Sequence, residues 1–483
     1  MNPDVCVIGS GPGGAMIAQR LARAGAKVVI LEEGGLHTKA EFDMQEATAY
    51  PRLYQDRGNR ATADLSIAIL QGRAVGGGTV VNWTTSYRTP DHVLEHWRKT
   101  EGTELTAEAL KPHFDEVEQR LNIQKVDLDD TNPNNRAVYD GCTKLGWQVD
   151  TTRRNVKGCL RSGYCGMGCP VDAKQSAALT YLPDAIAAGA ILKPGSRAEK
   201  IETSNGRATA VVGRDFRIEP KLVVLSAGAL NSPALLLRSG ITRGPVGKKS
   251  WLHPTIAMGA YYDQRIEGFY GAPQSVASHH FAQRPEGAGF FIEAAPVHPM
   301  LAALAAPGFG APLRANMAQM ANLCATIGLM IDGFSEGEEG GTVTLRPDGG
   351  PRLDYAFTPR MYECFRAAMK AICRLHLANG AREIHTSHVE EVSIRSESDI
   401  AKIDHAPMGP NLFGVFSAHQ MGGCRMGADP KRSVVNPQLR HHQIENLFVV
   451  DGSVFPTGLG VNPMESIYGV ASWAAQHVQK ALA

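Results

Sequence analysis

The most constraining feature of this chain is a glycine-rich turn close to its N-terminus. An apolar run at residues 5–8 leads into Gly9, Gly11 and Gly14, and a pattern of helical period follows to Ala24. In such a turn Gly9 permits the sharp bend, Gly11 lets the backbone approach a pyrophosphate, and Gly14 lets the helix pack on the strand. Free N–H groups at the helix N-terminus then bind the anion. The pattern predicts a site for an adenine dinucleotide, either NAD or FAD.

The end of the next apolar run points to the ribose of that dinucleotide. Residues 27–31 form a second short apolar run, which ends on Glu32. A carboxylate about 20 residues after the glycines can hold the ribose hydroxyls. Further glycine-rich segments occur at residues 72–78, 226–228 and 451–452. NAD usually needs one phosphate-binding turn, so several separated contact segments favour the longer FAD molecule.

The composition is that of a globular protein of more than one domain. The chain has 483 residues, of which 43% are hydrophobic and 20% charged, with a formal net charge of +1. The absence of a basic or acidic block argues against nucleic acid or an anionic membrane as the main partner. The first apolar run lacks the charged segment and cleavage site of a secretory signal, and no run approaches the length of a membrane span. We expect a cytoplasmic protein without a membrane span.

The order of the apolar runs predicts an α/β fold with an insertion. Buried strands are expected at residues 5–8, 27–31, 221–225 and 447–450, whereas residues 256–404 carry short β-like runs of a different character. This alternation predicts a discontinuous Rossmann-like FAD-binding domain with an inserted antiparallel-sheet substrate domain. The expected FAD-binding domain comprises residues 1–90, 155–255 and 405–483, and the expected substrate-binding or cap domain comprises 91–154 and 256–404.

Two residues near the C-terminus suit the oxidation of an alcohol. This reaction needs a base for the hydroxyl proton, and histidine has a suitable pKa near neutral pH. His419 lies between small residues and glycines, and Asn462 precedes Pro463. We expect His419 to act as general base and Asn462 to hold the alkoxide oxygen, with hydride transfer to N5 of the flavin. Taken alone, His419 would more often be a core histidine and Asn462 a turn residue.

The motifs, taken in order, resemble those of the glucose-methanol-choline (GMC) FAD-dependent oxidoreductases. The similarity is carried by residues 5–14, 72–78 with Asn82, 228–241, 419–427 and 460–463. Within that family the chain looks most similar to long-chain (fatty) alcohol oxidases and related bacterial alcohol dehydrogenases. The resemblance implies an oxidoreductase acting on the CH–OH group of a bulky hydrophobic or aromatic alcohol. Electrons would pass to oxygen or to an external acceptor.

The motif and the resemblance together give a set of residues expected to bind FAD. Some members of the family attach the flavin covalently through a histidine just before the position of Asn82; here that residue is Val81, so we expect non-covalent FAD. The expected cofactor-binding residues are Gly9, Gly11, Pro12, Gly13, Gly14, Glu32, Glu33, Arg73, Val75, Gly77, Gly78, Asn82, Ala198, Ala227, Gly228, Asp451, Gly452, Asn462 and Pro463. His253, in a segment similar to one in the family, is interpreted as structural.

A cysteine-rich loop leaves a second interpretation open. Cys159, Cys165 and Cys169 lie within eleven residues, and thiolates at such spacing can hold an iron–sulfur cluster. The spacing resembles that of bacterial FAD-dependent glucose dehydrogenase subunits, which carry a [3Fe-4S] cluster. The alternative is that these are buried thiols packed beneath the flavin. With a cluster bound, the chain could be the catalytic subunit of an electron-transfer dehydrogenase complex.

Two further alternatives have no cluster. Hydroxynitrile lyases resemble this family without catalysing net redox chemistry, and a flavin-binding protein without catalysis would need neither His419 nor Asn462. Apolar residues between 300 and 330 could line a pocket for a bulky alcohol, although most are expected in the core. They are Met300, Leu301, Leu304, Met317, Met320, Leu323, Leu329 and Met330.

Overall fold

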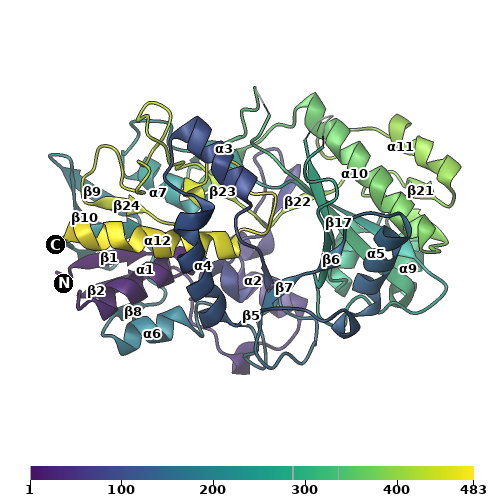
Figure 1. Cartoon of the computed structure of the whole chain (residues 1–483), viewed down its shortest axis with the longest axis horizontal. Coiled ribbons are helices and arrows are strands. Elements are labelled where there is room, and N and C mark those ends of the chain that lie inside the picture. Colours follow the sequence, from purple (N-terminus) through teal and green to yellow (C-terminus); the bar gives the residue numbers. More distant parts are fainter. Residues whose placement is uncertain (1, 285–287, 336, 483) are drawn as a thin grey trace.

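The computed structural model describes residues 2–284, 288–335 and 337–482. The molecule is elongated, with a parallel sheet and both chain termini at one end and a large, mainly antiparallel sheet at the other (Figure 1). None of the described helices combines the length and the hydropathy that a membrane span requires.

The parallel sheet is assembled from segments that are far apart in the sequence. Its five strands pair in the order β24-β12-β1-β2-β8, and all the pairs are parallel. The central strands are apolar and buried along their whole length, as expected for a sheet covered on both faces. The predicted strands at 5–8, 27–31, 221–225 and 447–450 are confirmed within one residue. Their bounds are β1 (Val5–Ile8), β2 (Val28–Leu31), β8 (Ile191–Lys193), β12 (Leu222–Leu225) and β24 (Leu447–Val449).

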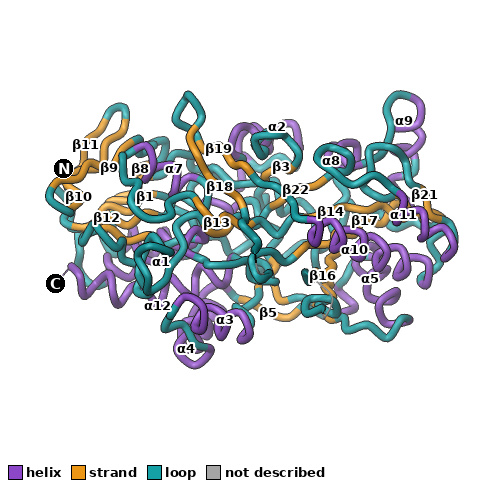
Figure 2. Tube along the Cα trace, turned by 90° about the horizontal axis from the view of Figure 1, so that it is seen from above, coloured by secondary structure: helices purple, strands orange, loops and turns teal. Residues whose placement is uncertain are grey.

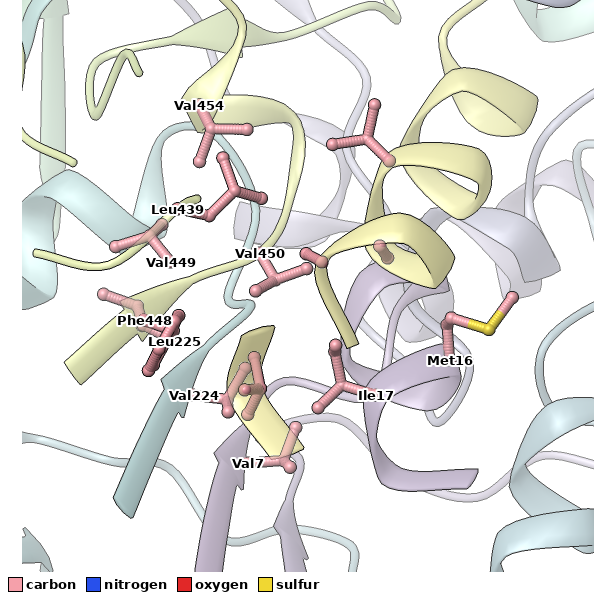
Figure 3. Close-up of a cluster of buried hydrophobic side chains, with 14 of the residues drawn as sticks. Val7, Met16, Ile17, Val224, Leu225, Leu439, Phe448, Val449, Val450 and Val454 are labelled. Atoms are coloured by element: carbon pink, nitrogen blue, oxygen red, sulfur yellow. The ribbon is translucent and has the colours of Figure 1, made fainter. Parts of the chain in front are cut away.

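Helices from several parts of the chain pack around this sheet. Ile17 of α1 and Val7 of β1 point into one apolar core with Val224 and Val450 (Figure 3). The same core includes Trp97 of α3. The helices of this end are α1 (Pro12–Arg23), α3 (Asp91–Glu101), α4 (Ala107–Leu121), α6 (Tyr181–Ala187), α7 (Asn231–Arg238) and α12 (Met464–Leu482).

The larger sheet forms a second core with α5 (Pro133–Lys144) and α10 (Pro359–Ala378). Its main path is β21-β20-β14-β17-β16-β15-β6, and β22 and β3 extend it from β14. Alternate residues of β16 contribute to different clusters: Phe290 and Ile292 face the helices, and Phe291 faces the other side. The strands are β3 (Ile67–Ile69), β6 (Asp150–Thr151), β14 (Thr255–Tyr261), β15 (Val276–Ser278), β16 (Phe290–Ala294), β17 (Leu323–Met330), β20 (Glu383–His385), β21 (Ser393–Ile394) and β22 (Val415–Ser417).

Smaller sheets complete the fold. The strands β13, β18 and β19 lie between the two ends of the molecule (Figure 2). The sheets are β19-β18-β13-β23, β11-β10-β9 and β4-β7-β5. Their strands are β4 (Thr85–Ser86), β5 (Ile123–Lys125), β7 (Arg153–Asn155), β9 (Lys200–Ser204), β10 (Arg207–Gly213), β11 (Phe216–Ile218), β13 (Lys248–Trp251), β18 (Gly341–Leu345), β19 (Pro351–Asp354) and β23 (Met421–Gly422). The remaining helices are α2 (Glu46–Leu53), α8 (Pro299–Ala305), α9 (Ala311–Ala318) and α11 (Lys402–His405).

The fold class predicted from the sequence is confirmed, because a Rossmann-like parallel sheet is combined with an inserted antiparallel one. The predicted domain boundaries stay a prediction. Helices α3 and α4, placed in the substrate domain by the sequence, pack in the core of the parallel sheet. Conversely, β3 and β22, which the sequence placed in the FAD-binding domain, pair with each other and extend the large sheet. Each of the two predicted domains therefore includes elements that pack with the other sheet in the structure.

Candidate active site

A cavity of about 470 Å³ lies beyond the carboxyl ends of β1, β2, β12 and β24. This edge of an open α/β sheet is where ligands bind, because the loops that follow the strands diverge there. Segments 8–13, 70–85, 196–198, 226–238, 346–351, 418–420 and 451–467 all contribute residues to its wall. The fold therefore joins the glycine-rich segments to the C-terminal motifs in one site.

Most of the predicted cofactor-binding residues line this cavity. They are Gly9, Gly11, Pro12, Gly13, Glu32, Glu33, Arg73, Gly77, Gly78, Asn82, Ala198, Ala227, Gly228, Asp451, Gly452, Asn462 and Pro463. Two predicted residues do not line it. A β-carbon on Gly14 would meet the carbonyl oxygen of Gly9, so Gly14 serves the packing of helix on strand. Val75 is buried in the first core, and its N–H donates to the carbonyl of Gly35 at 2.9 Å.

The glycines of the cavity wall fall into two kinds. Gly9 has a φ of +99°, which permits the turn. A β-carbon on Gly13 would collide with the carbonyl oxygen of Val450, so this glycine is required by packing. By contrast, β-carbons on Gly11 and Gly78 would meet no atom of the described residues within 4 Å and would extend into the cavity. These two positions keep the wall open for a ligand.

The carboxylate of Glu32 joins the two turns at the ends of β1 and β2. It accepts hydrogen bonds from the N–H of Ser10 at 3.0 Å, the hydroxyl of Ser10 at 2.7 Å and the N–H of Gly34 at 2.8 Å. Burial raises its pKa to about 7, although these bonds oppose the rise. The role of Glu32 toward a ribose stays a prediction.

In the same way, the carboxylate of Asp451 joins the loops that follow β12 and β24. Its carboxylate accepts from the N–H of Gly228 at 2.9 Å, the hydroxyl of Ser232 at 2.5 Å and the N–H of Ser453 at 2.8 Å. Three polar groups from two distant segments are thereby held at one corner of the cavity. A short aspartate side chain at the start of a helical turn is well suited to this.

His419 and Asn462 meet on the wall of the cavity. Nε2 of His419 lies 3.4 Å from Nδ2 of Asn462. His419 is half-buried, yet the dense protein around it lowers its pKa by burial to about 4, so the ring is uncharged at neutral pH. The amide oxygens of Asn462 and Asn82 are buried without a partner among the described residues. The wall thus offers unpaired polar atoms that a bound cofactor or substrate can engage.

Two further groups lie behind this pair: His253, which the sequence analysis interpreted as structural, and Glu293, to which it assigned no role. His253 Nδ1 lies 3.2 Å from His419 Nδ1, and the two rings meet edge to face. Glu293 on β16 is 0% exposed, and neither carboxylate oxygen has a hydrogen-bond partner among the described residues. Burial raises the pKa of Glu293 to about 8, and the Asn462 side chain opposes this rise. The sequence did carry one signal for Glu293, because it is a charged residue within the otherwise apolar run 290–294.

Other lining residues come from segments to which the sequence assigned no role. Arg60 is almost fully buried and donates to Asp56 at 2.9 Å and to Gln71 at 2.6 Å. Arg346 and Asp348 reach the cavity from the inserted region. An arginine or glutamine in a loop has no spacing signal of its own, so only the packed structure identifies them.

The apolar residues considered as a substrate pocket do not line this cavity. Leu329 and Met330 are buried in the clusters of the large sheet, whereas Leu304 is 77% exposed. Met300 and Leu301 pack on a separate cluster around Tyr50 and Tyr54. The apolar residues that do line this cavity include Trp83, Met464 and Ile467.

The three cysteines of the loop lie together around a second, small cavity with Arg154 and Lys174. Arg154 contacts Cys165 Sγ at 3.5 Å. Lys174 is almost fully buried, and burial lowers its pKa to about 8. Its Nζ donates to the carbonyls of Cys165 at 2.7 Å and Asn82 at 3.0 Å, and to that of Val80. All nine cysteines are free thiols.

Comparisons with known proteins agree with this architecture. The family model described as GMC oxidoreductase matches residues 50–255 in its N-terminal part and 337–471 in its C-terminal part. The model described as FAD binding domain matches residues 2–40.

Similar sequences include the long-chain-alcohol oxidase FAO4B of Arabidopsis thaliana, 31% identical over 97% of this chain and 66% of the relative. The chain thus spans slightly less than two thirds of that protein. An uncharacterized GMC-type oxidoreductase of Mycobacterium tuberculosis is 34% identical over 97% of this chain and 74% of the relative. Among solved structures, pyridoxine 4-oxidase from Mesorbium loti has a TM-score of 0.74 at 20% identity, covering 98% of each chain.

Proposed function

The chain belongs to the GMC oxidoreductase family and is an FAD-dependent oxidoreductase, and from this premise we propose that it oxidises the CH–OH group of an alcohol to a carbonyl. The observation that carries the proposal is the position of His419 and Asn462. Their side chains lie 3.4 Å apart on the wall of the cavity that also contains the glycine-rich turns. Two neutral polar groups at one point suit the binding of a hydroxyl oxygen.

The proposed substrate is a bulky hydrophobic or aromatic alcohol. Trp83, Met464 and Ile467 contribute apolar surface to the wall of the cavity that also contains His419, and largely apolar walls with a few polar groups are typical of sites for such ligands. A relative at 31% identity is named a long-chain-alcohol oxidase, which supports the same class of donor.

FAD would be held non-covalently by the residues that line the cavity. Gly11 and Gly78 leave space beside the backbone for the pyrophosphate, and the first turn of α1 offers N–H groups to it. When bound, the flavin accepts the hydride equivalent from the alcohol carbon. The chain's own contribution is to hold the hydroxyl between His419 and Asn462 and to supply an acceptor for the hydroxyl proton.

The sequence predicts His419 as the general base of this reaction. That role requires a free lone pair on Nε2, the nitrogen that faces Asn462. A neutral imidazole carries one hydrogen, so its location decides whether Nε2 is a base or a hydrogen-bond donor.

An anaerobic screen of flavin bleaching tests the proposed function. Aliphatic, aromatic, sterol and sugar alcohols are mixed with the FAD-loaded protein, and air is then admitted. We expect a hydrophobic or aromatic alcohol to bleach the flavin. The rate of colour return in air measures oxygen as the electron acceptor. If no alcohol bleaches the flavin, the redox proposal fails, and the hydroxynitrile lyase alternative is then tested by cyanohydrin cleavage.

The cysteine loop favours a second candidate, the catalytic subunit of an electron-transfer complex. Cys159, Cys165 and Cys169 surround one small cavity, and Lys174 connects this loop to the carbonyl of Asn82 on the main cavity. A [3Fe-4S] cluster at the three thiols would supply an electron exit beside the flavin site. Iron and acid-labile sulfide in anaerobically purified protein, lost in a Cys165→Ser variant, would support it. Protein free of both would overturn it.

A further inference from the structure

His253 lies behind His419 in a conformation that the surrounding structure enforces. Its side chain is completely buried, and its φ of +45° lies in the left-handed region that a residue with a β-carbon rarely adopts. The Asp332 carboxylate accepts the N–H groups of Leu252 at 2.7 Å and His253 at 3.2 Å. Strain of this kind persists where neighbouring groups over-determine the backbone, and it is frequent at functional sites.

The hydrogen bonds of His253 determine which of its nitrogens carries the hydrogen. Nε2 accepts two backbone N–H groups, from Leu459 at 2.9 Å and from Gly460 at 3.0 Å. A nitrogen that accepts two donors cannot carry a hydrogen itself. His253 therefore has its hydrogen on Nδ1. Because a cationic ring would also place a hydrogen on Nε2, the ring stays neutral, which agrees with a pKa held well below its ordinary value by burial.

The hydrogen on His253 Nδ1 then determines the state of His419. The two Nδ1 atoms lie 3.2 Å apart. His253 is the donor of this bond, so His419 Nδ1 must supply the lone pair. A neutral His419 therefore carries its own hydrogen on Nε2, the nitrogen directed toward Asn462.

Building on the proposed function, we propose that His253 is a positioning residue that holds His419 in the tautomer with the hydrogen on Nε2, so that His419 donates a hydrogen bond to the substrate oxygen. His419 Nε2 and Asn462 Nδ2 are then both donors, 3.4 Å apart. Two donors do not bond to each other, but both can bond to one oxygen placed between them. This arrangement stabilises negative charge on that oxygen. In this proposal His419 is a hydrogen-bond donor, whereas the sequence predicts it as the general base.

The hydroxyl proton must then leave to another acceptor. The Glu293 carboxyl group lies near Asn462, on the face of β16 that also presents Phe291 to His253. Both of its oxygens lack a hydrogen-bond donor at bonding geometry among the described residues. An ionised Glu293 therefore has acceptor capacity that those residues leave unused.

Nitrogen NMR of protein labelled with ¹⁵N-histidine tests the tautomer directly and needs no substrate. His253→Asn and His419→Gln variants assign the two sets of signals. We expect His419 to show a hydrogen-bearing Nε2 and an unprotonated Nδ1, with and without FAD, and His253 to show the reverse. A hydrogen on His419 Nδ1 would overturn the proposal.

Variants of His253 show whether it causes this state. The asparagine introduced by His253→Asn keeps an N–H group near the position of Nδ1, whereas the leucine of His253→Leu has none. We expect His419 to keep its hydrogen on Nε2 in the asparagine variant and to become a mixture of tautomers in the leucine variant. An unchanged His419 spectrum in folded His253→Leu would overturn the causal role. If that variant does not fold, the wild-type and His253→Asn spectra still decide the tautomers.

Kinetics separate a donor from a base at His419. Glutamine donates a hydrogen bond through its amide but cannot take up a proton at neutral pH. For a donor, we expect His419→Gln to keep kcat/KM within roughly tenfold of wild type, and His419→Ala to lose on the order of 10²–10³-fold. Equal, large losses in both variants would favour the base and overturn the proposal. These outcomes differ from a failure of the proposed function, in which no alcohol bleaches the flavin of the wild type.

Discussion

Tyr355 donates its hydroxyl hydrogen to the carboxylate of Asp332 at 2.7 Å, and both side chains are buried. The same carboxylate holds the backbone of Leu252 and His253. The bond therefore connects the segment after β19 to the strained turn beneath His419. Burial raises the pKa of Asp332 to about 7, and the Tyr355 hydroxyl opposes the rise.

Tyr355→Phe should reduce both stability and turnover. Loss of this buried hydrogen bond should lower the free energy of unfolding by about 1–2 kcal/mol, since the Asp332 oxygen loses one of its donors. A less firmly held His253 should also lower kcat more than it changes KM. Urea unfolding and steady-state kinetics measure these effects. Tyr270→Phe is the matched control, because Tyr270 is 60% exposed. Equal behaviour of the two variants would contradict the prediction.

Two glycine substitutions should separate cofactor binding from folding. In Gly11→Ala the new β-carbon enters the cavity, and its φ of −65° is ordinary for alanine. We expect a folded protein in which crowding costs about 1–3 kcal/mol of binding, or about 5- to 150-fold in the Kd for FAD. In Gly13→Ala the β-carbon collides with the Val450 carbonyl, so folding itself should suffer.

Fluorescence titration of the apoprotein with FAD and thermal unfolding without FAD measure the two effects. Normal FAD affinity in Gly11→Ala would show that the cofactor does not pass close to this residue. Wild-type stability in Gly13→Ala would contradict the packing role of that glycine.

Removal of the His419 ring should stop turnover but leave the cofactor in place. His419→Ala should lower kcat by on the order of 10²–10³-fold, because one of the two proposed donors to the substrate oxygen is lost. The glycine-rich turns are untouched, so the ratio of FAD to protein should equal that of the wild type. His442→Ala, which removes a histidine outside the cavity wall, is the control. Turnover near the wild-type rate would remove His419 from the reaction.

Glu293 should make the protein less stable as the pH rises. Its pKa is raised from an ordinary value of 4.5 to about 8 in the fold, so the folded state binds an extra proton between these values. The contribution of Glu293 to the free energy of unfolding is fully present below about pH 4.5. It decreases by up to roughly 4–5 kcal/mol as the pH rises through about 8.

A Glu293→Gln variant removes this titration. We expect the difference in Tm between pH 5.5 and pH 8.5 to be smaller than in the wild type, whatever the absolute stability of the variant. Glu339→Gln, at a carboxylate that is 88% exposed, should keep the wild-type difference. If Glu293 accepts the hydroxyl proton, kcat/KM should also rise with pH up to about 8 in the wild type and become flat in the variant. If the variant kept the wild-type pH dependence of Tm, the fold would not raise the pKa of Glu293, and the prediction would be wrong.

Features that depend on local chemistry could be predicted from the sequence. The strands at residues 5–8 and 222–225 are short apolar runs, each preceded by a charged residue and followed by glycine or serine, and such runs have few alternatives to a buried strand. The turn at Gly9 requires a left-handed residue, which the sequence supplies directly. The contributions of Arg60 and Glu293 were missed, because one charged residue in a loop or strand carries no pattern.

By itself, the sequence determined that this chain has a dinucleotide-binding turn, an α/β sheet and a histidine–asparagine pair, because glycine conformation and apolar periodicity are properties of short segments. Only the tertiary structure decided that these segments share one cavity, since its walls come from loops hundreds of residues apart. It is also the basis for the role that we propose for His419. The position of its hydrogen depends on His253, whose own hydrogen is fixed by two backbone N–H groups at Leu459 and Gly460. A hydrogen bond depends on distance and direction in space, and no spacing along the chain encodes either.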